Sequence, residues 1–270
     1  MSGEPAEHRP RADGPFLAAL AVMGGSYIAL IVAMLLADVL WTTPADLIAS
    51  LRSKEIRFAV WLSMISCTMT AILSLWVGVP LGYLLSRYDF RGKQLLDALL
   101  DVPIVLPPLV IGLSLLILFQ TPVGRAIERH VSVTYAVPSV ILAQFAVAAA
   151  FAARTMRVTF DQISPRREQV ALTLGCSRSE AFWRVVLPEA WRGVVTAGTL
   201  AWARSLGEFG PVLVFSGATR LRTEVLPTTV FLELSVGNLD GAVAVSLLMV
   251  AAAVVVLLIV RVFGQAEASR

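Results

Sequence analysis

The sequence predicts an all-α integral membrane protein with about six transmembrane helices. Apolar residues make up 57% of the 270 residues and charged residues only 15%, and the mean hydropathy is +0.77. Roughly one-quarter of the residues of an ordinary soluble domain are charged, so lipid is the natural solvent for this chain. The basic residues occur in short clusters between long apolar runs, which indicates a membrane orientation signal and not a nucleic-acid surface.

Six apolar runs are long enough to cross a membrane as helices, because a hydrocarbon core of about 30 Å requires around 20 helical residues. The runs lie near 16–40, 58–86, 95–120, 134–153, 194–217 and 240–263. A polar stretch without a small-residue cleavage site precedes the first run, so we expect this run to remain as an anchor. We predict a transmembrane domain over 16–265 and short tails at 1–15 and 266–270.

The distribution of Lys and Arg predicts the orientation. When connections are assigned alternately to the two sides, one side collects fourteen basic residues and the other seven. Basic residues are enriched in cytoplasmic loops. Both tails and the long connection over 154–193 are therefore predicted to be cytoplasmic.

Two short sequence patterns predict a short helix between apolar runs and a charge interaction at the start of one run. Thr43 followed by Pro44 suits the N-cap and first turn of a short extracytoplasmic helix that continues to Leu51. Asp97 and Asp101 lie at the start of the third run, where carboxylates favour the positive end of a helix dipole. We expect the dipole interaction to be their role.

Prolines and glycines predict breaks and close contacts in the second and third runs. Pro103, Pro107 and Pro108 interrupt the third run, and such breaks persist in a membrane only where protein or a water-filled cavity satisfies the freed carbonyls. We therefore expect Pro107 and Pro108 to line a translocation pathway. Gly78 and Gly82 have the spacing of a close-packed helix contact.

The fifth run carries two charges near its middle, Arg204 and Glu208. Charges at that depth require a partner or water. Because they are four residues apart, they can pair with each other. Alternatively, Arg204 faces the pathway and offers a positive site to a passing dianion, while Glu208 weakens the attraction so that the ion can leave. Gly207, Gly210 and Pro211 permit close packing or a local break, which would suit a moving gate.

The connection over 154–193 is too long for a simple turn, since helix connections usually have two to eight residues. From Pro165 it reads PRREQVALTLGCSRSEAFWRVVLPEAWRG, with apolar residues spaced as on short helices. Gly175 is expected to end the first helix and Ser179 to cap the second. Composition alone also fits an amphipathic helix on lipid headgroups.

The spacing of this loop resembles the signature loop of bacterial ABC-importer permeases. The family pattern is EAA, three residues, Gly, nine residues, Ile, one residue and Leu-Pro. The matching positions are Gln169, Val170, Ala171, Gly175, Val185, Leu187 and Pro188. The chain departs at Gln169 and Val170, where the family usually has Glu and Ala, although Glu168 lies one position earlier.

The resemblance implies a type I ABC-importer permease, in which this loop forms a cytoplasmic coupling helix that seats in a cleft of the ATPase subunit. The residues implied to couple to the ATPase are Glu168, Gln169, Ala171, Gly175, Leu187 and Pro188.

Two further segments resemble molybdate and sulfate permeases, so that the resemblance covers about 55–265. The segment from Phe58 to Gly112 is similar to their corresponding helices and includes an LPP element. The segment from Ala203 to Gly217, ARSLGEFGPVLVFSG, is similar to the ARSLGEFG of the molybdate subgroup, whereas sulfate permeases more often show ALGEYG. The resemblance thus implies import of molybdate, with tungstate as a further candidate and sulfate or thiosulfate as the alternative.

The resemblance also implies the partners and the location. These are ABC ATPase subunits, an extracytoplasmic substrate-binding protein, a second copy of the chain and the lipid of the cytoplasmic (inner) membrane. The sequence has no GxxxxGK[ST] phosphate loop, so ATP and Mg are expected on the ATPase and no cofactor on this chain. HExxH and GxSxG are absent too, and we expect no catalytic or metal-binding residues. A stand-alone secondary transporter or channel is the alternative, and a membrane-bound enzyme ranks last.

Overall fold

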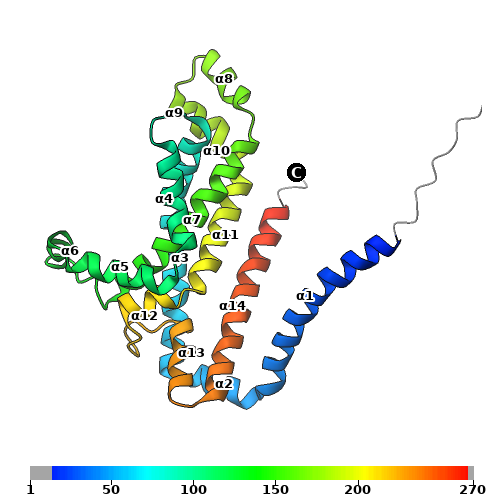
Figure 1. Ribbon diagram of the computed structural model, residues 1–270, viewed down its shortest axis with the longest axis vertical. Helices are drawn as coiled ribbons and strands as arrows, with labels where there is room; N and C mark the ends of the chain where they lie inside the picture. Colours follow the sequence, from blue (N-terminus) through cyan, green and yellow to red (C-terminus); the bar gives the residue numbers. More distant parts are fainter. Residues whose placement is uncertain (1–13, 267–270) are drawn as a thin grey trace, which may run out of the picture. The chain divides into compact units, whose positions relative to one another are not determined.

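The computed structural model describes residues 14–266, and this part of the chain is helical throughout, with short connections (Figure 1). Residues 1–13 and 267–270, nearly all of the two predicted tails, lie outside the described range. The chain divides into two units, 1–44 and 45–270, which we describe separately. The elements in chain order are α1 (Gly14–Trp41), α2 (Pro44–Arg52), α3 (Lys54–Arg87), α4 (Lys93–Val105), α5 (Pro108–Gln120), α6 (Pro122–Glu128), α7 (Val137–Gln162), α8 (Pro165–Thr173), α9 (Arg178–Ala181), the π-helix η1 (Phe182–Val186), α10 (Leu187–Glu189), α11 (Trp191–Leu206), α12 (Gly210–Ser216), α13 (Leu226–Ser235) and α14 (Leu239–Ala266).

Helices α1 and α2 agree with the predicted boundaries. In the first unit, α1 contains a segment, Phe16–Trp41, that is long and apolar enough to cross a membrane. Asp38 is the one charged residue of this helix. Helix α2 begins at Pro44, as predicted, and ends one residue beyond Leu51.

In the second unit, α3, α7 and α14 are also long and apolar enough to span a membrane, which confirms the runs near 58–86, 134–153 and 240–263. The other two predicted runs are not continuous helices. The run 95–120 is divided between α4 and α5, which are bent by 112° relative to each other. The run 194–217 is divided between α11, which has 16 residues, and α12. Within 14–266, four helices thus qualify as continuous spans and the bent pair as a fifth.

Proline sterics explain the first break, and glycine and proline flank the second. Leu106 is extended between α4 and α5, as expected for a residue that precedes a proline, and Pro107 is the N-cap of α5. The predicted interruption is therefore confirmed, although α4 continues through Pro103. In the other run, α11 ends at Leu206, and Gly210 begins α12 after the connection 207–209.

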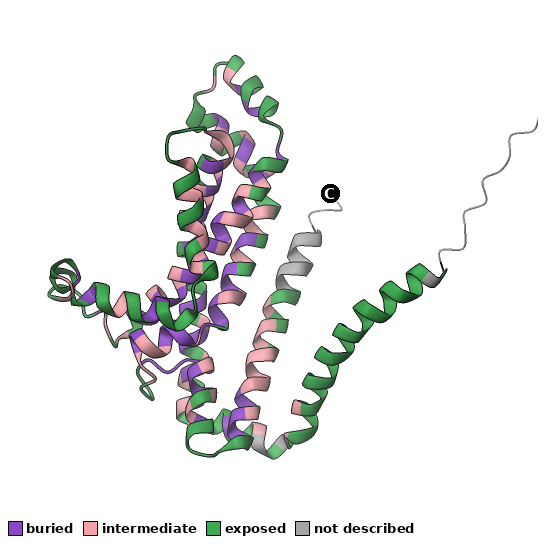
Figure 2. Ribbon diagram, in the orientation of Figure 1, coloured by how far each residue is buried: buried purple, intermediate pink, exposed green. Residues whose placement is uncertain are grey.

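The core of the second unit lies where α3, α7 and α11 run side by side (Figure 2). A Cβ atom on Gly82 would lie 2.7 Å from the Cβ atom of Met156, and one on Gly78 would lie 3.0 Å from that of Ala152. Only glycine allows the two backbones to approach so closely. The predicted close-packed contact is therefore confirmed, and its partner is α7.

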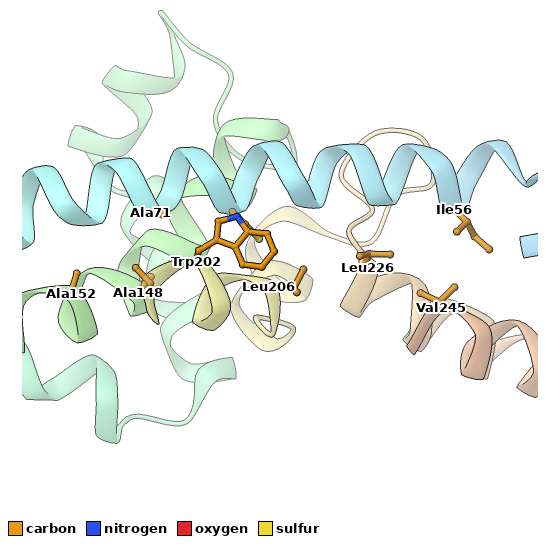
Figure 3. Close-up of a cluster of buried hydrophobic side chains, with 10 residues drawn as sticks. Ile56, Ala71, Ala148, Ala152, Trp202, Leu206, Leu226 and Val245 are labelled. Atoms are coloured by element: carbon orange, nitrogen blue, oxygen red, sulfur yellow. The ribbon is translucent and has the colours of Figure 1, made fainter. Parts of the chain in front are cut away.

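A second part of the core contains side chains of α11, α13 and α14. The ring of Trp202 points towards α3, beside Ala148 of α7 (Figure 3), and its Nε1 donates a hydrogen bond to Oγ1 of Thr68 at 3.3 Å. Further along the same cluster, Leu226 of α13 and Val245 of α14 are buried. Helix α13, which was not predicted, carries its proline at the second position, where a missing N–H costs no helical hydrogen bond.

Candidate functional site

The two helix breaks meet in space. Helix α12 packs against α5, and a Cβ atom on Gly112 would lie 2.8 Å from Cα of Pro211. A Cβ atom on Gly210 would lie 3.0 Å from the backbone nitrogen of Leu109 and 3.1 Å from Cβ of Pro108. The structure thus brings the break of the third predicted run, with Pro107 and Pro108, next to the break of the fifth.

Arg204 and Glu208 form an ion pair. Nη1 of Arg204 lies 2.6 Å from Oε1 of Glu208, whose side chain is 1% exposed. The side chain of Arg204 is 30% exposed, and its Cζ lies 5.7 Å from the ring centroid of Phe151 on α7, within the range of a cation–π contact. The pairing predicted from the four-residue spacing is confirmed. The arginine side chain thus keeps an exposed part beside the break.

A buried polar chain fixes the end of α11 before the break. Nε2 of Gln144 on α7 donates to the carbonyl of Ser205 at 3.3 Å, and Oγ1 of Thr70 on α3 donates to Oε1 of Gln144 at 3.2 Å. Ser205, Gln144 and Thr70 are all buried. Buried amides that are fully bonded specify one arrangement, so Arg204 is held on a fixed helix turn.

The predicted loop 154–193 is shorter in the structure, because α7 continues to Gln162 and α11 begins at Trp191. The connection between them contains α8, α9, η1 and α10 and lies at one end of α7 and α11 (Figure 1). Gly175 ends α8 with φ +94°, as predicted for a glycine C-cap. The prediction of Ser179 as the next cap is wrong, because Ser177 is the cap. Its Oγ accepts from the backbone N–H of Glu180, whose carboxylate accepts from the N–H and hydroxyl of Ser177 and has a lowered pKa for that reason.

The six predicted coupling residues lie on different faces of the loop. Gln169, Gly175 and Pro188 are exposed, and Leu187 is half-buried. Ala171 and Glu168 are buried, Glu168 at 8% exposure. Two apolar residues of α8 and its end are also strongly exposed: Val170 is 56% exposed and Leu174 is 79% exposed.

Asp97 and Asp101 have a more specific role than the predicted dipole interaction. Nε of Arg154 donates to Oδ1 of Asp101 at 2.8 Å, and its Nη1 donates to Oδ1 of Asp97 at 3.0 Å. Arg157 also contacts Asp97. The dipole prediction is therefore corrected: the two carboxylates bind α4 to α7, because they project from one face of α4 towards arginines one turn apart.

Several residues of this region were not recognised in the sequence as part of a site. Tyr83 and Arg87 contact the loop, and Phe151 and Gln144 surround the break. For the contact between α4 and α7, a signal was present in the sequence: the two acids of α4 are four residues apart and the two arginines of α7 are three apart, so each pair shares a helix face. The others give no local signal, because their partners are distant along the chain, 61 residues away for Gln144 and 85 for Tyr83.

Comparisons with known proteins agree on one family. The model of the family described as "Binding-protein-dependent transport system inner membrane component" matches residues 78–267. A probable molybdenum ABC transporter permease of Haloferax volcanii is 35% identical over 82% of this chain and 81% of its own length. A molybdenum transport permease of Mycobacterium bovis is 36% identical over 74% and 76%, and a sulfate transport permease of Escherichia coli is 31% identical over 83% and 81%.

Solved structures show the same fold at low identity. A chain of a bacterial ABC transporter that imports alginate matches with a TM-score of 0.74 and 14% identity, over 94% of this chain and 96% of that one. A second structure, of a bacterial alginate ABC transporter in complex with an alginate-bound periplasmic protein, has a TM-score of 0.72 and 15% identity, over 93% of both chains.

Proposed function

Because the chain belongs to the family of binding-protein-dependent transport system inner membrane components, we propose that it is the membrane-spanning subunit of an ATP-driven importer for a tetrahedral oxyanion. Molybdate is the first candidate, with tungstate beside it. The ARSLGEFG segment and the names of the molybdenum permeases among the relatives support molybdate. The sulfate permease among the relatives makes sulfate the alternative.

The exposed apolar residues of the loop carry this proposal. Val170 and Leu174 lie outside the membrane-spanning helices, next to the exposed Arg166 and Arg167. An apolar patch with a polar rim marks a surface for a protein partner. We propose that a separate ATPase, which holds ATP and Mg, binds the loop at this patch on the cytoplasmic side.

The junction of α5 and α12 is the proposed gate. Arg204 offers a positive charge to a dianion. Glu208 weakens the attraction between the two, so that the ion can leave the site. Pro107 and Pro108 lie in the same junction as the break after Leu206. We propose that a second copy of the chain completes the pathway and that an extracytoplasmic binding protein delivers the ion.

The ATPase surface is tested with a matched pair of valine variants. Val170→Asp introduces a charge into the proposed patch, whereas Val131→Asp does so at a valine of similar exposure before α7, at its opposite end. We expect Val170→Asp to lose the co-purified ATPase and Val131→Asp to retain it. Equal retention in both variants would remove the loop from the proposed mechanism.

The substrate is tested by uptake of labelled molybdate in cells with and without the gene, with and without a large excess of unlabelled sulfate. Uptake that disappears on deletion and resists sulfate supports molybdate. Uptake that is unchanged on deletion excludes molybdate as the substrate of this importer, and the same assay is then repeated with labelled sulfate.

A further inference from the structure

Glu168 is turned away from the exposed patch of the loop and towards the chain's own helix α3. Its neighbours Arg167 and Gln169 are exposed, whereas Glu168 is 8% exposed. The hydroxyl of Tyr83 donates a hydrogen bond to Oε1 of Glu168 at 2.6 Å, and Nε of Arg87 lies 3.6 Å from Oε2. Both carboxylate oxygens are thus engaged within the chain.

The same two residues of α3 also contact the start of the loop and η1. Nη2 of Arg87 donates to the carbonyl of Ile163, directly after α7, at 2.7 Å. The ring of Tyr83 makes edge contacts with Phe160 of α7, at 5.5 Å between centroids, and with Phe182 of η1, at 4.8 Å. The last turns of α3 therefore contact the loop directly after α7, at α8 and at η1.

The contact through Glu168 is a polar link at the edge of the apolar cluster that includes Tyr83, Phe160 and Phe182. A cavity of about 180 Å³ lies beside it, lined by Arg87, Tyr88, Pro165, Glu168, Gln169, Leu172 and Arg178. Since side chains do not fill this space, α8 is held to α3 here by the hydrogen bond and the ion pair. The Glu168 carboxylate is thus a direct polar connection between α8 and α3.

Helix α3 is well placed to pass such a displacement on. Gly82 lies one residue before Tyr83, and its backbone is packed against Met156 so closely that no Cβ atom fits. Closely packed interiors transmit strain and do not deform continuously. A pull on the end of α3 is thus shared with α7, which carries Gln144 and Phe151 beside the break.

We propose that Glu168 is a positioning residue that links the ATPase-binding loop to α3 through Tyr83 and Arg87, and that it does not contact the ATPase itself. This inference rests on the proposed function, since it requires an ATPase bound to the loop. Val170 and Leu174 bind the partner in this scheme, and Glu168 carries the motion of α8 into the membrane helices.

The test uses the complete importer, reconstituted with its ATPase and binding protein, and measures molybdate transported per ATP hydrolysed. The variants are Tyr83→Phe, Glu168→Gln and the two combined. Tyr83→Phe removes one oxygen atom and keeps the ring contacts. It therefore tests the hydrogen bond to Glu168 even if Glu168→Gln fails to fold. Tyr27→Phe is the matched control, a tyrosine of α1 outside this contact.

We expect both single variants to retain the bound ATPase and its hydrolysis of ATP, while transport per ATP falls about fivefold or more, the lower end of ordinary coupling between two sites. The double variant should be no worse than the more affected single variant, because both changes break one link. Loss of ATPase binding, additive effects or an unchanged ratio would overturn the assignment of Glu168. Uptake that needs no ATPase would overturn the proposed function instead, and with it this role.

Discussion

The Cα atom of Pro211 lies 2.8 Å from the position that a Cβ atom on Gly112 would occupy. Gly112→Ala therefore forces α5 and α12 apart, because the obstacle is backbone and cannot rotate away. Overpacking of this kind costs about 1–3 kcal/mol. We expect a lower free energy of unfolding in detergent and reduced anion uptake.

Gly207→Ala is the control for this substitution. Its new methyl group would meet only the carbonyl oxygen of Arg204, at 3.9 Å, so the free energy of unfolding should change by less than about 0.5 kcal/mol. If the two variants unfold alike, the close packing of the helix breaks does not limit stability.

We expect single substitutions of Arg204 and Glu208 to lower the free energy of unfolding by unequal amounts. Arg204→Ala leaves the 1% exposed carboxylate of Glu208 without its partner, and removal of one member of a buried pair costs about 3–5 kcal/mol. Glu208→Gln should cost less, because the guanidinium is partly exposed and can be hydrated. Chemical denaturation of both purified variants measures the difference.

The double variant, Arg204→Ala with Glu208→Gln, separates the pathway role from the pair. It removes both charges, so it should be more stable than Arg204→Ala alone. If Arg204 attracts the anion, this folded double variant still imports poorly. Normal uptake in this double variant would show that Arg204 only forms the ion pair with Glu208 and does not attract the anion.

Local chemistry explains which parts of the fold could be predicted from the sequence. The Leu106 to Pro107 break and the Gly175 helix end follow from proline sterics and glycine's positive φ, which need no knowledge of distant residues. The Gly82 contact was predicted as a contact but not with its partner, because the four-residue spacing says nothing about which helix approaches.

The errors and omissions also have physical causes. Ser177 and Ser179 are both suitable caps by type, and Glu180, three residues after Ser177, decides between them through reciprocal hydrogen bonds. The inward face of Glu168 depends on where α3 ends, and Tyr83 is 85 residues away along the chain. The spacing of apolar residues within the loop carries no information about so distant a partner.

Gly175 predicts a contrast between two substitutions of nearly equal shape. Its φ of +94° disfavours most side chains, but Asn and Asp tolerate positive φ better than other residues, and a Cβ atom there would meet no atom within 4 Å. We expect Gly175→Asn to retain the ATPase and Gly175→Asp to release it, since only the charge differs. Co-purification measures this, and equal retention would indicate that this end of α8 lies outside the interface.

The contact between Asp101 and Arg154 predicts rescue by charge exchange. None of the 13 residues of α4 is buried, so ionic contacts contribute to its position against α7 more than packing does. Asp101→Arg or Arg154→Asp alone places like charges together and should lower both uptake and the thermal unfolding temperature. The exposed fractions of these side chains, 41% and 35%, limit the loss to about 1 kcal/mol for each pair. The exchanged double variant should regain part of the uptake, whereas additive losses would show that the pair does not hold α4.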